Sequence, residues 1–371
     1  MIFPNNDKIS ISQLRSTLIL SVIGVGILGL PRTLSEAAGT DGWFLLIMAG
    51  TIVTILAYIY GYIIQSFPGM NWFEVLSINL SRPIAYIVSV YFFIYFIVTA
   101  GYVIRIFAAV IKMMLLLRNT PREILVLSFL LVVGYMGRKG IETLGRLAES
   151  LVIPLLIFTI IIFAVSTEDI EVVNFLPILQ TSPMDLVKGL PSIIFNFLGI
   201  ELILIFGSFV NKPKDSAKTS AMATLIILVV YLFLNASVLG LLGDQQMRYL
   251  VWPTITALEN VYIGGGFIEN IAVLLMSVWV IVAFTTVAPM YLASGIMLSE
   301  IFKTKEYNYL TLPLIPILYT AANWSKSLAD VYKDLEVINR YMGIGVLVII
   351  PLILLIVMKI RKTHKVIKKE I

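Results

Sequence analysis

Apolar runs of about 20 residues recur along the whole chain, and they constrain its fold more than any other feature. A run of that length crosses the hydrocarbon core of a bilayer as a helix, which pairs its own backbone groups there. The chain is 59% hydrophobic and only 13% charged, about half the charge of a soluble domain. We therefore expect an all-α integral membrane protein with about ten transmembrane helices. The predicted spans are about 11–34, 41–66, 84–110, 122–136, 141–165, 187–209, 218–242, 268–300, 309–323 and 341–359.

Several functional classes are excluded by what the sequence lacks. With no cysteine, no disulfide or thiolate–metal site can form, and the single histidine, His364, cannot hold a metal alone. No nucleotide-binding loop, zinc-protease motif or usable Ser/His/Asp set occurs, so neither enzyme activity nor a cofactor is expected. The net charge of +5 is explained by the positive-inside bias of membrane proteins, not by nucleic acid. The first apolar run continues directly into the body of the protein, so no cleavable signal peptide is expected.

The distribution of charge predicts the orientation. With the N-terminus in the cytoplasm, most basic residues between spans lie inside, and an even number of spans puts the C-terminus there too. We expect a single transmembrane transporter-like domain over 1–371, with halves at about 11–165 and 187–359. The basic tail, 360–371, would lie near anionic lipid. The inner basic groups are Arg138, Lys139, Lys212, Lys214, Lys218, Lys303, Lys305 and Lys359 to Lys369, and the outer acidic groups are Glu168, Asp169, Glu171, Asp244 and Glu259.

Two shorter amphipathic segments are expected to lie at the membrane surface. Residues 71–81 combine apolar side chains with polar neighbours, which suits a helix at the inner surface. Residues 325–340 place Leu328, Val331 and Leu335 on one stripe with charges opposite, which suits the outer surface. This stripe is equally suited to docking a partner protein.

The first span is interrupted by Gly24-Val25-Gly26-Ile27-Leu28-Gly29-Leu30-Pro31. Glycine lowers helix stability, and proline removes an amide donor and crowds the carbonyl four residues back. Non-helical backbone survives at membrane depth only against protein or a polar cavity. The interruption therefore indicates a ligand or ion site, although glycines in membrane helices also serve close helix packing.

The sixth span has a matching interruption. Asn196, Gly199 and the ionisable Glu201 lie at mid-depth in the apolar run that starts at Leu190-Pro191. Transporters with inverted repeats place one discontinuous helix at corresponding positions of each half, with the substrate between them. Ten spans divided five and five make spans 1 and 6 the first members of two oppositely oriented halves. The sequence therefore predicts a five-plus-five inverted repeat with discontinuous helices 1 and 6.

The two breaks suggest a ligand chemistry. Free amides near Gly26 to Leu28, at the start of a half-helix, suit a carboxylate. Exposed carbonyls around Gly24 and around Phe197–Gly199 suit an ammonium. Together these groups describe a zwitterionic amino acid, and a small neutral polar molecule fits them nearly as well.

Other polar residues inside the spans add candidates. Glu201 is a candidate proton carrier, a partner for a cation, or a hydrogen-bonding group that desolvation keeps neutral. It lacks an obvious basic partner in a neighbouring span, which favours the neutral form. Thr285 and Thr286 could complete a cation site with the carbonyls of the first break, or simply bond the carbonyl one turn back. Tyr91, Tyr95, Thr99, Tyr102 and Arg105 share one face of span 3, which suits an aqueous route or aromatic packing.

Several motifs together resemble a known family. They are Ile9-Ser10-Ile11-Ser12-Gln13-Leu14, the Gly24–Pro31 segment, Ala38-Gly39 with Asp41-Gly42-Trp43, Phe175-Leu176-Pro177-Ile178, and Gly199-Ile200-Glu201. Over essentially its whole length the chain resembles the spore germination permeases, the B subunits of endospore nutrient germinant receptors. These belong to the amino acid–polyamine–organocation transporter superfamily.

The resemblance implies a location in the spore inner membrane, assembly with A and C subunits, and sensing of a nutrient such as an amino acid. Some superfamily transporters carry a lysine in span 5 in place of a cation, and none lies in the apolar part of span 5 here. A secondary amino acid transporter coupled to a proton or cation, and a structural or channel subunit with an unused pocket, are the alternatives. Glu201, Tyr95 and Tyr102 are candidates for a proton or polar relay. The implied substrate-binding set is Gly24, Val25, Gly26, Ile27, Leu28, Phe195, Asn196, Phe197, Gly199, Thr285 and Thr286.

Overall fold

The computed structural model confirms the all-α prediction. Across the residues that it describes, the chain folds into helices, and the one β-bridge pairs Ile9 with Val210. The described residues are 7–24, 26–114, 120–165, 169–259, 271–304 and 306–363. The predicted features that lie outside them are Val25, Glu168, Lys305, His364 and the tail from residue 364 onward.

The first span is discontinuous. Helix α1 (Ile11–Ile23) begins at a capping box, in which the side chains of Ser10 and Gln13 each accept the other's backbone N–H. It ends at Gly24, whose φ of −26° and ψ of −114° are not helical. Helix α2 (Gly26–Ala38) then begins, so the described residues from Gly26 to Pro31 are already helical.

Pro31 is accommodated inside α2 by a side chain from another helix. A helical proline leaves the carbonyl four residues back, here that of Ile27, without its N–H donor. Thr254, in α10 (Pro253–Glu259), donates its hydroxyl to the Ile27 carbonyl at 2.8 Å. This hydroxyl replaces the missing N–H donor and so stabilises the helix on either side of the proline.

The sixth span is discontinuous as well. Its parts are α7 (Pro183–Ile194), η4 (Phe195–Phe197), η5 (Ile200–Leu202), α8 (Ile203–Phe206) and η6 (Gly207–Phe209). The direction of the chain changes by 52° between the part that ends at Phe197 and the part that begins at Ile200. Gly199 has a φ of +112°, a backbone conformation that residues with a Cβ rarely adopt. Both predicted discontinuous helices are therefore present.

The other predicted spans also fall on helical segments. Two of them, 122–136 and 141–165, lie in α6 (Arg122–Val165), where non-helical backbone at Gly140, with φ of +80° and ψ of −179°, separates two helices. Within the described residues six helices are long and apolar enough to cross a membrane, or seven with the bent α7–η6 pair, so the count of ten stays a prediction. The remaining elements are η1 (Gly39–Asp41), α3 (Gly42–Ser66), α4 (Trp72–Asn79), α5 (Arg82–Met114), α6 (Arg122–Val165), η3 (Val172–Phe175), η7 (Pro213–Asp215), α9 (Ser216–Tyr249), α11 (Ile271–Phe302), α12 (Asn308–Thr311), α13 (Leu314–Ala322), α14 (Leu328–Ile338), the π-helical η8 (Asn339–Gly343) and η9 (Gly345–Ile349), and α15 (Ile350–Arg361).

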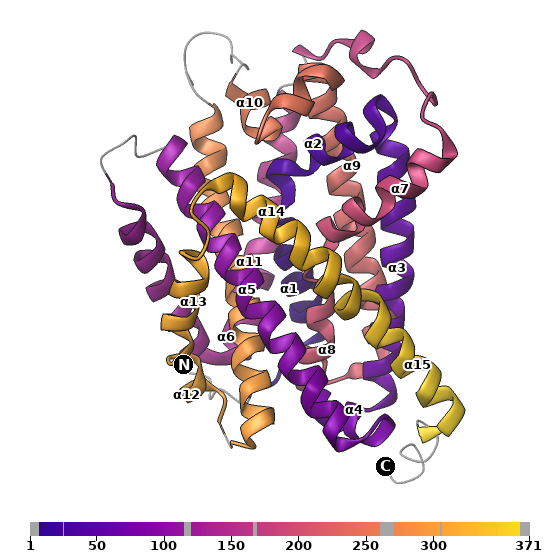
Figure 1. The fold of residues 1–371 in the computed structure, drawn as a ribbon, viewed down its shortest axis with the longest axis vertical. Coiled ribbons are helices and arrows are strands. Elements are labelled where there is room, and N and C mark those ends of the chain that lie inside the picture. The colour runs from indigo at the N-terminus through magenta and orange to yellow at the C-terminus, as the bar shows by residue number, and fades with distance from the viewer. Residues whose placement is uncertain are drawn as a thin grey trace.

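The broken first span occupies the interior of the bundle. Helix α1 packs against α6, α9 and α11, while α3 packs along α9 and α5 along α11 (Figure 1). The continuous rod from α14 to α15 crosses the outside of α5, as the yellow helices in Figure 1 show. The long helices thus surround both breaks, and Gly26 and Asn196 at these breaks are partly buried.

Segments that were predicted to be cytoplasmic gather at one end of the bundle. Ile9 donates its backbone N–H to Phe209, just before the basic loop at 212–214, and Thr363 donates to the side chain of Asn79. Figure 1 shows α4 and the end of α15 together at this end. Which side of the membrane this end faces stays a prediction.

Candidate functional site

The two helix breaks lie against each other. A Cβ atom on Gly26 would lie 3.6 Å from the backbone oxygen of Asn196, and one on Gly199 would lie 3.2 Å from the backbone of Ser21. The two breaks therefore lie in close contact, and at Gly199 both the short distance and the positive φ of +112° favour glycine. Breaks that are more than 170 residues apart in the sequence therefore form one site.

Thr286 of α11 packs directly against the first break. A Cβ atom on Gly24 would lie 1.6 Å from the Thr286 hydroxyl oxygen, so no side chain fits there. This oxygen is 3.4 Å from the Leu20 carbonyl and 3.3 Å from the Val282 carbonyl. Thr285 donates to the Val282 carbonyl, at 2.9 Å, which is ordinary bonding to the preceding turn. Of the two threonines, Thr286 is therefore the one placed at the break.

Tyr231 of α9 joins the two breaks, and the sequence analysis did not select it. Its buried hydroxyl lies 2.9 Å from the Val22 carbonyl oxygen and 3.1 Å from the Asn196 carbonyl oxygen. Its ring packs edge-on against Phe197, with centroids 5.4 Å apart. A tyrosine in a long apolar run is usually interpreted as packing. The only signal in the sequence is that this residue carries a hydroxyl group among apolar neighbours.

Glu201 is completely buried directly after the second break. Its Oε2 accepts the Gly199 N–H at 2.8 Å, while Oε1 has no hydrogen-bond partner in the described part of the chain. Tyr95 and Tyr60 are its electrostatic neighbours, and the Tyr95 hydroxyl is likewise unpartnered there. Tyr102 instead bonds Asp334 of α14, at 3.2 Å. The structure thus brings Tyr95 to Glu201 and directs Tyr102 elsewhere.

The remaining predicted residues lie around the breaks. Phe197 is buried, and a Cβ atom on Gly343 of η8 would lie 3.2 Å from the ring of Phe195. Leu28 and Ile27 line a small cavity beside the first break, of about 30 Å³. That volume holds about one water molecule, whereas ligand pockets occupy several hundred Å³. The residues that line this cavity lie in α1, α2, α6, α10 and α11, and none of them belongs to the second break. The other residues that line the cavity are Leu20, Ile23, Leu155, Leu156, Thr159, Phe163, Thr254, Val278, Trp279 and Val282.

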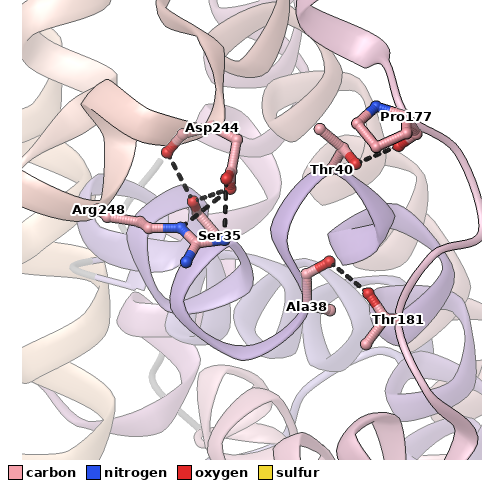
Figure 2. A network of polar contacts seen from close by, with 7 residues as sticks. All are labelled: Ser35, Ala38, Thr40, Pro177, Thr181, Asp244 and Arg248. Carbon is pink, nitrogen blue, oxygen red and sulfur yellow. Dashed lines mark hydrogen bonds and ion pairs between the residues drawn. The ribbon is translucent and has the colours of Figure 1, made fainter.

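The far end of α2 is tied to two other segments (Figure 2). The Ser35 hydroxyl donates to Asp244 of α9, which also pairs with Arg248 at 2.8 Å. Thr181, between η3 and α7, donates to the Ala38 carbonyl at 2.9 Å. A hydroxyl bond from Thr40 to the carbonyl of Pro177 adds a further tie, seen at the right of Figure 2. A displacement of α2 must break several of these bonds.

A cavity of about 650 Å³ opens to solvent beside these ties. Its carboxylates already have protein partners: Asp41 accepts the N–H of Thr181 at 2.8 Å, and Asp185 accepts the Ser182 hydroxyl at 2.8 Å. Glu36 pairs with Arg32 at 2.7 Å. Across the residues with described side chains, no cluster of three or more His, Asp or Glu suits a metal ion.

Comparison with known proteins identifies the family. Residues 8–331 match the profile of the family described as spore germination protein, the spore permeases. The chain belongs to this family. YndE, a spore germination protein of Bacillus subtilis strain 168, is 23% identical over 97% of this chain and 99% of its own length. The spore germination protein GerLB of Bacillus cereus is 25% identical over 97% of this chain and 96% of its own.

Two solved structures share the fold of this spore permease. MhsT, in complex with L-phenylalanine, superposes with a TM-score of 0.67 over 85% of this chain and 80% of its own, at 10% identity. Mhp1, a nucleobase-cation-symport-1 family transporter in a closed conformation, superposes with a TM-score of 0.65. The superposition covers 91% of this chain and 77% of the Mhp1 chain, at 13% sequence identity. Both have the inverted-repeat fold of the LeuT-type transporters. This permease is an integral membrane protein with that fold.

Proposed function

We propose that this spore permease is the B subunit of a nutrient germinant receptor, which binds a small nutrient between its two helix breaks. The observation that carries the proposal is the meeting of the two breaks inside the bundle, with Gly26 facing Asn196 and Thr286 against Gly24. Family membership supports a role in germination, and the transporter fold supports a ligand site at this place.

The chemistry at the breaks favours an amino acid. The first amides of α2, from Gly26 to Leu28, form the positive end of a half-helix and would receive a carboxylate. The Val22 and Asn196 carbonyls at the breaks, which the Tyr231 hydroxyl contacts, would receive an ammonium. Ligand binding would favour one conformation of the bundle and pass this change to A and C subunits in the spore inner membrane. Glu201 and Tyr95 are proposed as the polar relay beside the site.

A ligand-dependent thermal shift of the purified protein tests this proposal, with all amino acids and a set of sugars and nucleosides as probes. We expect at least one amino acid to raise the melting temperature in proportion to its concentration. Absence of any shift across the whole set would count against the site.

Secondary transport is the second candidate, because both solved neighbours have transporter folds. Uptake of a labelled amino acid into vesicles that contain this chain alone separates the two roles. Gradient-driven accumulation would establish transport, whereas binding without accumulation would support a receptor.

A further inference from the structure

We propose that a phosphate group binds where the end of α5 meets the start of α6, held by Arg105 and Arg122. The group belongs either to an anionic lipid of the membrane or to free phosphate in solution. This site goes beyond the proposed function, because it uses none of the residues at the two helix breaks.

Arg105 is a buried cation without a counter-ion. It lies in α5, nine residues before the helix ends at Met114, and only 7% of it is exposed. Its side chain makes no ion pair or hydrogen bond in the described part of the chain, and its Nε is buried without a partner. A buried charge is costly unless it is paired, so an arginine in this position is a candidate for binding an anion.

A second arginine lies close to Arg105. Arg122 is the first residue of α6, and its Nε is also buried with no partner among the described residues. The two guanidinium groups are electrostatic neighbours and repel each other. Lys112 lies seven residues after Arg105, on the same face of α5, and adds a third positive charge. Folding alone disfavours such a gathering of like charges, which indicates that the cluster binds an anion.

The neighbouring carboxylate offsets only part of this charge. Glu123 pairs with Arg122 at 3.2 Å and is an electrostatic neighbour of Arg105 and Lys112. Its side chain is 48% exposed, so solvent screens its attraction to the buried Arg105. Three positive charges and one negative charge leave these four side chains with a net charge of +2.

The donors of the cluster suit a phosphate. Guanidinium groups bind oxyanions through paired N–H donors, and a phosphate has enough oxygen atoms to bridge two of them. The free N–H groups in the first turn of α6 add the positive end of a helix dipole at Arg122. A carboxylate has two oxygen atoms and one charge, so it would serve one arginine and leave the other unpaired.

The surroundings favour a lipid as the source of the phosphate. The cluster lies where the predicted spans 84–110 and 122–136 meet the outer membrane surface, which is the depth of lipid phosphates. Ile124, Leu127 and Leu131 on the following turns of α6 are all exposed, as expected of a helix that faces acyl chains. A lipid that packs along this face would bring its phosphate to Arg122, and the long stem of Arg105 would extend to it from the apolar span.

Thermal unfolding of the delipidated protein in detergent tests the site, with phosphatidylglycerol, phosphatidylcholine, inorganic phosphate and succinate as probes. We expect phosphatidylglycerol to raise the melting temperature of the wild type at a lower concentration than phosphatidylcholine does. A rise with inorganic phosphate as well would show that a free phosphate is sufficient, whereas a rise with the lipid alone would assign the site to a headgroup. No rise with either phosphatidylglycerol or phosphate would overturn the proposal, and so would an equal rise with phosphatidylcholine or with succinate.

Arg105→Gln is the decisive variant, and Arg82→Gln is its control, because Arg82 is an exposed arginine at the opposite end of α5. Loss of charged hydrogen bonds should raise the phosphatidylglycerol concentration that gives half of the full rise by about tenfold in Arg105→Gln, and by less than about twofold in Arg82→Gln. If Arg105→Gln does not fold, Arg122→Gln, whose side chain is 29% exposed, should show the same loss. An unchanged lipid response in these variants, or an equal loss in Arg82→Gln, would overturn the site. The amino acid probes of the proposed function are measured separately, so either proposal can fail alone.

Discussion

The two helix breaks differ in how each one satisfies its own backbone. The first is abrupt: α1 ends at Gly24, and Thr286, Tyr231 and Thr254 on other helices supply the groups around it. The second is spread over two 3-10 turns and brings its own cap, because Glu201 accepts the N–H of Gly199 two residues away. The first break therefore depends on its neighbours, and the second is partly determined by its own sequence.

Gly24→Ala should have the largest effect on stability, because it changes the break that depends on contacts with other helices. The new Cβ would overlap Thr286, and relief requires α1 and α11 to separate, at a cost of about 3 kcal/mol. Thermal unfolding of the purified protein measures this loss. The control is Gly29→Ala, because nothing lies within 4 Å of a Cβ there and alanine favours the helix by up to about 1 kcal/mol. Equal melting temperatures for the two variants would show that the contact with Thr286 is not restrictive.

Gly199→Ala should be the next most damaging. Its φ of +112° is strained for alanine, which costs about 2 kcal/mol, and the Ser21 backbone lies 3.2 Å from the new Cβ. The same unfolding measurement gives the comparison. If Gly199→Ala lowered the free energy of unfolding more than Gly24→Ala, the first break would not be the one that depends more on contacts with other helices.

Two substitutions of Glu201 distinguish its hydrogen bond to the Gly199 N–H from a proton-relay role of its carboxyl group. Glu201→Ala leaves the buried Gly199 N–H unpaired and should cost about 1.5 kcal/mol, whereas Glu201→Gln keeps an acceptor and should cost about 0.5 kcal/mol. If the carboxyl relays protons, Glu201→Gln should abolish a germination response that depends on them while ligand binding persists. Wild-type germination in spores that carry Glu201→Gln would leave the residue with capping alone.

The threonines of α11 provide the smallest contrast. Thr286→Val removes a hydroxyl that reaches the first break and should weaken ligand binding by about fivefold, whereas Thr285→Val removes a bond within its own helix and should change binding less than twofold. Titration of the stabilising amino acid measures both. Equal effects would mean that Thr286 serves its own helix as Thr285 does.

Much of the fold could be predicted because its signals are local. Apolar runs gave the helices, three closely spaced glycines gave the first break, and Asn196 with Gly199 gave the second. The extent of the irregular backbone was harder to predict. Pro31 lies inside a helix, where it leaves the Ile27 carbonyl without an N–H donor. Thr254, more than 220 residues later, supplies that donor. Local propensity carries no information about such a partner.

The candidate site was predictable in part for the same reason. Glycines at membrane depth and a buried Glu201 stand out against an apolar background. Tyr231 does not, since a tyrosine among leucines and valines has the same pattern whether its hydroxyl is structural or central. Tyr95 and Tyr102 lie on one face of α5, yet they face different parts of the molecule. Tyr102 bonds Asp334 of α14, whereas Tyr95 is an electrostatic neighbour of Glu201.

The sequence by itself determined that this spore permease is a helical membrane protein with two interrupted spans, because hydrophobic length and backbone flexibility are properties of short segments. Only the tertiary structure decided that the interruptions meet, that Thr286 rather than Thr285 closes the first, and that Tyr231 bridges both. Those outcomes depend on which helices pack side by side. Packing brings distant carbonyls and hydroxyls within hydrogen-bonding distance, where burial makes every unpaired group costly.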